Sequence, residues 1–154
     1  KVAAIIFGRF IKLFPGRKFP EPERVLMEPF EQLRGVGLSN QKVGYIQNIA
    51  QAAKDGILPD SRQANRMSDD ELIDRLTSIK GVGRWTVEML LIFRLGRPDV
   101  LPATDYGVQK GFALAKGWAE LPKPKELLAA GECWAPYRTV ATWYLWRTAD
   151  TGTL

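Results

Sequence analysis

The sequence contains no histidine and a single cysteine, Cys133. Without histidine, a Ser-His-Asp arrangement, an imidazole general base and a histidine metal site are all excluded. One cysteine forms no disulfide within the chain, no zinc knuckle and no thiolate-ligated iron–sulfur cluster. A lone cysteine without a histidine partner is usually a buried apolar residue, so Cys133 is expected to be buried and unreactive. Catalysis would therefore rest on carboxylates, lysine, hydroxyls or backbone groups.

Long hydrophobic runs are absent as well, since no stretch approaches the ~20 apolar residues that cross a bilayer. The apolar start of the chain carries Arg9 and Lys12, which is unlike a signal peptide. We therefore expect no membrane association and a cytoplasmic location. The apolar spacing over residues 1–14 predicts a largely buried helix, yet no capping residue precedes Lys1. We expect that upstream sequence is missing from this chain.

The remaining composition is that of a globular protein, with 45% apolar and 25% charged residues in 154. This length predicts a single domain over residues 1–154. The net charge of +5 weakly favours a polyanionic partner. The surplus lies in residues 1–20, which hold five basic and no acidic residues, and in residues 77–116, which hold six basic and three acidic residues.

The apolar spacing is helical along the whole chain, with no alternation typical of strands and no repeat. Glycine, proline and capping residues mark where the helices end and begin. Helices are expected over residues 1–14, 22–28, 29–34, 40–55, 69–76, 84–95, 105–115, 122–133 and 137–148. The chain is therefore assigned to the all-α class.

Residues 76–86 (Leu-Thr-Ser-Ile-Lys-Gly-Val-Gly-Arg-Trp-Thr) join two amphipathic helices through a turn with two glycines. Glycine lets a backbone approach a ligand closely, and the N–H groups at the start of the next helix favour an anion such as DNA phosphate. Lys80 and Arg84 flank the turn and add charge attraction. The pattern predicts a helix-hairpin-helix over residues 76–95 that holds DNA without reading its sequence. An ordinary helix connection is the alternative.

Asp105 follows a short loop and lies where the next helix is expected to begin. The helix dipole and the free N–H groups at that point would keep its carboxylate ionised. An aspartate that only caps the helix would explain the position equally well.

Residues 79–86 (Ile-Lys-Gly-Val-Gly-Arg-Trp-Thr), followed by residues 101–105 (Leu-Pro-Ala-Thr-Asp), resemble the helix-hairpin-helix–Gly/Pro–Asp superfamily of DNA glycosylases. Within it, residues 83–86, 105–111 and 134–138 are most similar to the DNA-3-methyladenine glycosylase II branch. The resemblance covers nearly the whole chain. It implies an all-α fold of two helical lobes with a cleft, and excision of alkylated bases in base excision repair.

By this resemblance, Asp105 is the catalytic carboxylate, which stabilises positive charge on the sugar or orients the attacking water. Family positions that line the pocket of the flipped base are here Trp85, Tyr106, Met89 and Trp146. Positions that bind the DNA backbone are Lys80, Gly81, Val82, Gly83, Arg84 and Thr86. An indole face attracts a cationic base such as 3-methyladenine or 7-methylguanine by ~0.5–2 kcal/mol. Core packing is the alternative for Trp85 and Trp146, and Trp118, Trp134 and Trp143 are expected in the core.

The resemblance also bears on cofactors. Bifunctional relatives carry a lysine two residues past the second hairpin glycine, and because this position is Trp85, the chain is expected to be monofunctional. No cofactor and no iron–sulfur cluster are expected. A sodium or potassium ion would bind the backbone carbonyls of Thr77, Ile79 and Gly81. Family members also have N-terminal helices and a glutamine-rich segment that this chain lacks, so we expect it to bind DNA weakly or to be inactive alone.

The expected partner is double-stranded DNA with damaged bases, bound by a monomer that is associated with the nucleoid if the source is bacterial. A non-catalytic helix-hairpin-helix module that recognises DNA shape is the first alternative. An all-α protein-interaction domain is the second, and it predicts no salt-dependent DNA affinity. Within the enzyme class, a mismatch or oxidised-base glycosylase also fits these motifs.

Overall fold

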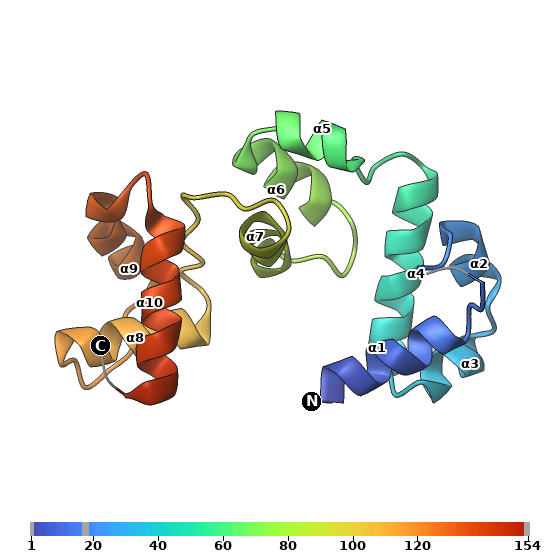
Figure 1. Cartoon of the computed structure of the whole chain (residues 1–154), viewed down its shortest axis with the longest axis horizontal. Helices are drawn as coiled ribbons and strands as arrows, with labels where there is room; N and C mark the ends of the chain where they lie inside the picture. The colour runs from blue at the N-terminus through green and yellow to red at the C-terminus, as the bar shows by residue number, and fades with distance from the viewer. Residues whose placement is uncertain (1, 17–18, 153–154) are drawn as a thin grey trace. The chain divides into compact units, whose positions relative to one another are not determined.

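The computed structural model describes residues 2–16 and 19–152. Every regular element in these residues is a helix, which confirms the all-α class (Figure 1). None of the described helices is long and apolar enough to cross a membrane. In chain order the elements are α1 (Val2–Lys12), α2 (Pro22–Met27), α3 (Phe30–Gly35), α4 (Asn40–Lys54), α5 (Ser61–Arg66), α6 (Asp69–Thr77), α7 (Arg84–Phe93), α8 (Tyr106–Lys116), α9 (Pro124–Gly131), the 3-10 helix η1 (Glu132–Trp134) and α10 (Arg138–Thr151).

Capping residues set several of these boundaries. Ser68 accepts a hydrogen bond from the Glu71 N–H, and the Glu71 side chain accepts one from the Ser68 N–H, which forms the predicted capping box of α6. The same arrangement starts α5, where Asp60 and Gln63 cap each other. This helix is missing from the sequence-based expectation, although the spacing of Asp60 and Gln63 is the same signal.

The chain divides into two compact units, residues 1–83 and 84–154. The division falls at the end of the hairpin turn, so α1 to α6 belong to unit 1 and α7 to α10 belong to unit 2. The single domain expected over residues 1–154 stays a prediction. Each unit has its own buried residues and is described by itself.

In unit 1, α1 packs one face on the core and leaves the other exposed. Phe10 is buried with Phe14, Val25 and Val43, whereas Phe7 is 55% exposed. The largely buried helix expected over residues 1–14 is therefore wrong. An isolated apolar sequence cannot show how many of its sides have neighbours, and α1 buries only the stripe that meets the core around α2 and α4.

In unit 2, α8 and α10 lie side by side (Figure 1). Gly111 allows this close approach, because a Cβ at that position would overlap the backbone carbonyl of Leu145 on α10. Phe112 of α8 is buried in the core of unit 2, and its ring meets those of Trp118 and Trp134 edge-on at centroid distances of 5.4 and 6.1 Å. The packing of α8 on α10 fixes the position of Asp105, the residue immediately before α8.

Three expectations about burial need correction. Trp118 is 49% exposed and Trp143 is 53% exposed, so neither is a core residue, whereas Trp134 packs partly buried against the unit 2 core. Large rings at the edge of a small unit bury one side only. Cys133 is exposed rather than buried, because it lies in the short helix η1, where its thiol donates to the carbonyl of Ala130.

Candidate active site

Asp105 lies at the N-terminus of α8, where its Oδ1 accepts a hydrogen bond from the Val108 N–H at 2.9 Å. The aspartate is therefore an N-cap, as its position in the sequence allows. Capping uses only part of the carboxylate, because each oxygen can accept more than one hydrogen bond. Its remaining partners indicate a second role.

Two tryptophans donate to the carboxylate of Asp105. The indole Nε1–H of Trp85, on α7, lies 2.7 Å from Oδ2. The indole Nε1–H of Trp146, on α10, lies 2.9 Å from Oδ1. Three segments that are distant in sequence thus meet at one carboxylate within unit 2. Asp105, Trp85 and Trp146 were all candidate site residues in the sequence, but the hydrogen bonds between them were not predicted.

These contacts keep Asp105 ionised. Partial burial alone would raise the pKa of Asp105, but the hydrogen bonds from Trp146 and Trp85 outweigh it. The backbone N–H groups of Val108 and Gly107 act in the same direction, so the pKa lies below its ordinary value. This agrees with the ionised carboxylate expected from the sequence.

The approach of Trp146 depends on Gly107. A Cβ on Gly107 would lie 3.0 Å from the Trp146 ring and 3.1 Å from Oδ1 of Asp105, closer than ordinary van der Waals contact. One face of the Trp146 ring is stacked on Phe93, with centroids 5.7 Å apart and planes at 12°. The stacked face is not available to a base. Phe93 was not singled out in the sequence.

The loop before Asp105 is tied to α10. Arg138 donates to both carboxylate oxygens of Asp99, at 2.7 and 2.8 Å. The Thr139 hydroxyl donates to the carbonyl of Arg97, and the Thr142 hydroxyl donates to that of Val100. Sequence reasoning missed these positioning residues, because threonines inside a helix carry no signal for a distant loop.

The other two predicted pocket residues differ in their surroundings. Tyr106 is 67% exposed and is the first residue of α8, directly after Asp105. Met89 is half-buried and lies one turn after Trp85 on α7. The structure therefore brings Trp85 and Trp146 onto Asp105, places Tyr106 beside it, and gives Met89 a place on the same helix as Trp85.

The turn of the hairpin ends unit 1. Gly81 has a φ of +103°, and a Cβ there would overlap the ring of Tyr45 on α4. The side chain of Asn48 donates to the Lys80 carbonyl at 3.0 Å, which attaches the turn to α4 a second time. Gly83 differs, since a Cβ at this position would meet nothing within 4 Å.

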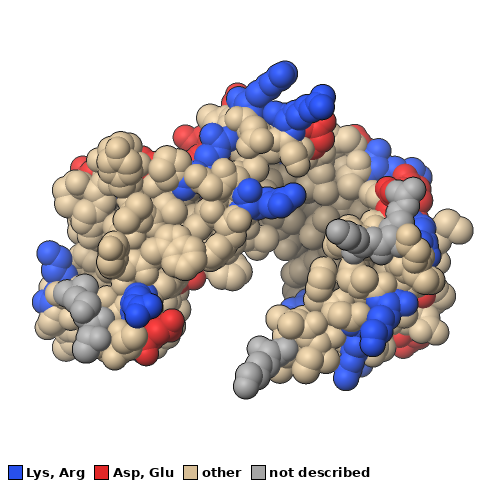
Figure 2. Space-filling model, in the orientation of Figure 1, with Lys and Arg blue, Asp and Glu red and all other residues tan. Residues whose placement is uncertain are grey.

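The predicted backbone-binding residues are mostly exposed. Lys80, Gly81 and Gly83 are exposed at the end of unit 1, with Val82 half-buried. Arg84 and Thr86 are exposed in the first turn of α7 in unit 2. On the face drawn in Figure 2, basic side chains are scattered, several beside acidic ones, and much of the surface is uncharged.

The carbonyls expected to hold a monovalent cation lie in the same turn. The Ile79 carbonyl accepts a hydrogen bond from the Val82 N–H at 2.9 Å, which leaves its second lone pair for a ligand. The Thr77 hydroxyl donates to the Ile73 carbonyl, and the backbone oxygen of Thr77 is the predicted ligand. The donor types of Thr77, Ile79 and Gly81 fit sodium or potassium, and the site stays a prediction. Within the described residues, no group of three or more acidic or cysteine side chains is arranged to hold a metal ion.

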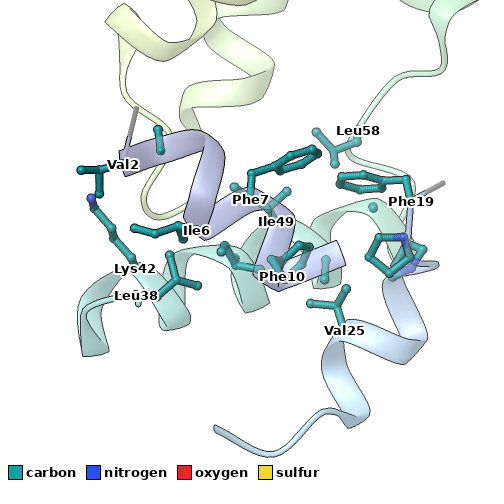
Figure 3. A pocket seen from close by; sticks show the side chains of 16 residues that line it. Val2, Ile6, Phe7, Phe10, Phe19, Val25, Leu38, Lys42, Ile49 and Leu58 are labelled. Atoms are coloured by element: carbon teal, nitrogen blue, oxygen red, sulfur yellow. The ribbon is translucent and has the colours of Figure 1, made fainter. Parts of the chain in front are cut away.

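A large apolar cavity lies in unit 1 and has no catalytic groups. It has a volume of about 660 Å³ and is lined by apolar side chains of α1, α2 and α4, among them Phe7, Phe10, Val25 and Ile49 (Figure 3). Lys42 is its only charged lining residue among those described. The cavity is therefore not the site of the chemistry that Asp105 can perform.

Comparison with known proteins places these features in context. DNA-3-methyladenine glycosylase 1 of Schizosaccharomyces pombe is 44% identical over 149 residues, which are 97% of this chain and 65% of that protein. An alkylbase DNA glycosidase-like protein of the same organism is 37% identical over 84% of this chain and 61% of its own length. The chain thus spans less than two thirds of each of these relatives.

Solved structures agree in fold. The S. pombe 3-methyladenine DNA glycosylase Mag1, solved in complex with abasic DNA, matches 96% of this chain and 72% of its own with a TM-score of 0.90 and 43% identity. A DNA-3-methyladenine glycosidase from Bacillus halodurans matches 97% of this chain and 68% of its own with a TM-score of 0.84 and 39% identity. The family model for HhH-GPD superfamily base excision DNA repair proteins matches residues 1–136. With a glycine hairpin before α7 and an aspartate at the start of α8, the chain belongs to this superfamily.

Proposed function

We propose that this chain carries the catalytic part of a monofunctional DNA glycosylase that hydrolyses the N-glycosidic bond of alkylated bases. The observation that carries the proposal is the ionised carboxylate of Asp105, oriented by the indole N–H groups of Trp85 and Trp146. Relatives named DNA-3-methyladenine glycosylase support the substrate class.

The chemistry requires a fixed negative charge near the sugar. As the bond between C1′ and the base nitrogen breaks, its electron pair leaves with the base and positive charge builds on the sugar. A carboxylate that is already oriented stabilises this charge without reorganising. The oxygen of a water molecule then bonds to C1′ and releases one proton to the solvent, which leaves an abasic site on the strand. Asp105 stabilises the charge or orients that water.

A covalent route through lysine is not supported. The residue two positions past Gly83 is Trp85, and its indole N–H is used on Asp105. Tryptophan offers no amine for a Schiff base with the sugar. The products are therefore a free base and an intact abasic strand.

Aromatic surface near Asp105 supports a preference for cationic bases. Trp85 is 49% exposed and Tyr106 is 67% exposed, so ring area of both is open to a ligand. A purine alkylated at a ring nitrogen carries positive charge, which an aromatic face attracts by roughly 0.5–2 kcal/mol. The target base has to leave the helix stack to reach such a surface, and a damaged base does so at lower cost.

DNA binding is assigned to the hairpin segment. Lys80 and Gly83 are exposed, and no Cβ blocks the approach of a phosphate to the Gly83 backbone. Arg84 and Thr86 open α7, where the helix dipole favours an anion. These contacts would hold DNA of any sequence, so specificity would rest on the base pocket.

The test is release of free methylated bases from methylated duplex DNA under single-turnover conditions. Asp105→Asn removes the charge with little change in size, and the release rate is expected to fall by about 10²- to 10³-fold. Asp150→Asn, an exposed aspartate on α10, serves as the matched control and should keep the wild-type rate. An N-terminally extended chain tested in parallel reports whether this polypeptide needs further residues for activity.

Three outcomes separate the candidates. Release that disappears with Asp105→Asn and persists with Asp150→Asn supports the glycosylase. Salt-dependent DNA binding without release by either chain favours a non-catalytic binding module. Release of mismatched or oxidised bases instead of methylated ones keeps the enzyme class and changes the substrate.

A further inference from the structure

Glu88, on α7, is a buried carboxylate that has no part in the mechanism above. Its side chain is 6% exposed, and it lies one turn after Arg84, whose side chain is 63% exposed. Oε1 of Glu88 accepts a hydrogen bond from Nε of Arg84 at 3.0 Å. The second oxygen, Oε2, is buried and receives no hydrogen bond from the part of the chain that the structure describes.

An ion pair of this kind is poorly suited to stabilising a helix. A buried carboxylate oxygen without a donor costs free energy, and pairing with an exposed arginine recovers little of it. Burial raises the pKa of Glu88, the hydrogen bond and charge of Arg84 lower it, and the negative charge of Asp105 raises it further, so that the net shift is upward. A buried carboxylate whose pKa is shifted by burial and by a charged partner is a candidate for a functional role.

The exposed partner shows what the pair can do. A guanidinium has five N–H donors in one plane, and Glu88 uses the one on Nε. The terminal nitrogens of Arg84 make no hydrogen bond to any described residue and belong to a side chain that is mostly exposed. Fixing Nε fixes the plane of the whole group, which is what a bidentate contact with a phosphate requires.

We propose that Glu88 is a positioning residue, which holds Nε of Arg84 so that the terminal nitrogens of the guanidinium face a phosphate of the DNA backbone. The inference rests on the proposed function, because the phosphate belongs to the DNA substrate. An arginine that is already oriented loses less side-chain freedom on binding than a free one, so the buried carboxylate contributes to affinity through Arg84. Because the charges of Arg84 and Glu88 cancel, the pair adds nothing to the net charge. The long-range attraction of DNA therefore comes from the other basic residues.

The experiment is a double-mutant cycle in the 154-residue chain. The dissociation constant for a duplex containing one abasic site is measured between about 50 and 200 mM salt. Over this range, the affinity of a protein with several phosphate contacts falls by about 10³- to 10⁵-fold. Arg84→Ala is expected to weaken binding about tenfold and to reduce the salt slope by about one. Glu88→Ala is expected to weaken binding about threefold in the wild-type background and to have no effect in the Arg84→Ala background.

Glu88→Gln separates positioning from folding. Glu88→Gln removes the buried negative charge, as Glu88→Ala does, but its amide oxygen still accepts a hydrogen bond from Nε of Arg84. The Glu88→Gln variant should therefore retain most of the DNA affinity that Glu88→Ala loses. Thermal unfolding of each variant reports any loss of stability, and Glu120→Ala, an exposed glutamate, is the control. A stabilising role alone predicts equal weakening by Glu88→Ala in both backgrounds.

Equal weakening in both backgrounds, or no weakening in either, would overturn the role of Glu88 while leaving the glycosylase proposal intact. If the unchanged chain shows no salt-dependent binding to the duplex, the DNA partner itself fails, and the inference about Glu88 fails with it. Coupling between the two substitutions, together with retention of affinity by Glu88→Gln, supports the inference.

Discussion

The indole N–H of Trp85 donates to Oδ2 of Asp105 at 2.7 Å, across a separation of 20 residues in the sequence. Trp146 donates to the other oxygen, so the carboxylate is held from two sides. The family resemblance predicts that both tryptophans line the pocket of the flipped base, with core packing as the alternative. The structure adds that their edges orient the acid while part of the Trp85 ring stays exposed. In the proposed function, Trp85 serves the carboxylate through its N–H and the base through its exposed ring.

Trp85→Phe tests this relationship, because it keeps an aromatic ring and removes the N–H donor. Burial then raises the pKa of Asp105 with one fewer hydrogen bond to oppose it. The acidic limb of the pH–rate profile of base release is expected to move to higher pH, and the rate at pH 7 to fall roughly tenfold. Trp118→Phe is the control, because it changes an exposed ring just past the C-terminal end of α8, whereas Asp105 caps the N-terminal end. An unshifted acidic limb would show that the N–H of Trp85 is dispensable.

Asp99 and Arg138 give a prediction about stability and pH. Hydrogen bonds from Arg138 hold the pKa of Asp99 below its ordinary value despite partial burial. A carboxyl with a lowered folded pKa contributes stability above its unfolded pKa of about 3.9, and the contribution is lost as the pH falls through the folded pKa. Asp99→Asn should therefore lower the free energy of unfolding by ~1 kcal/mol at pH 7, since both side chains are partly exposed.

This loss should shrink as the pH falls below about 4. The Asp99 carboxyl is protonated first in the unfolded chain and, at lower pH, in the folded chain, so its charge no longer favours the folded state. Urea unfolding of both proteins across pH 3 to 7 measures it, with the range chosen around that ordinary pKa of about 3.9. A difference that stays constant with pH would mean that Asp99 acts through packing and not through its charge.

The two hairpin glycines should respond differently to alanine. Gly81→Ala forces a Cβ into the Tyr45 ring at a φ of +103°, so a loss of about 1–3 kcal/mol in unfolding free energy is expected. Gly83→Ala meets nothing within 4 Å and should leave stability nearly unchanged. If the DNA backbone approaches Gly83 closely, Gly83→Ala will weaken DNA binding without affecting thermal unfolding. Unchanged affinity would remove Gly83 from the proposed interface.

Lys80→Ala should weaken DNA binding to a similar degree on different sequences, because a phosphate contact carries no base information. The slope of log affinity against log salt is expected to become shallower by about one. Lys54→Ala, an exposed lysine at the end of α4, removes the same charge elsewhere in unit 1. Equal changes for both variants would indicate a general effect of net charge instead of a contact at the hairpin.

Helix positions were largely predictable from the sequence because the signals are local. The capping box of Ser68 and Glu71 and the glycine after Lys116 both mark helix ends that the structure has. The missed helix α5 has an equivalent local signal in Asp60 and Gln63. Its lack of an apolar stripe hid it, since Ala64 is its only buried residue.

Burial was less predictable, because it depends on which neighbours each helix has. The apolar residues of α1 predicted a largely buried helix, yet Phe7 is exposed and Phe10 is not. Trp118 and Trp143 are exposed although tryptophan is generally well buried. Hydrophobicity indicates that a residue gains by burial, and it does not show whether the chain has atoms left to cover it.

Local signals were enough to predict the all-α class, the hairpin before α7 and the aspartate at the start of α8, because periodicity, glycine and capping act within a few residues. How that aspartate is held became visible only in the packed structure. Trp85 lies on α7 and Trp146 on α10, and they reach Asp105 because these helices pack around the start of α8. Gly107 leaves room for the Trp146 ring. The buried Oε2 of Glu88 also follows from tertiary packing, since a single sequence does not show which carboxylate oxygen lacks a donor. Contacts between distant residues exist only after the helices have packed, and the electrostatics of the candidate site depend on those contacts.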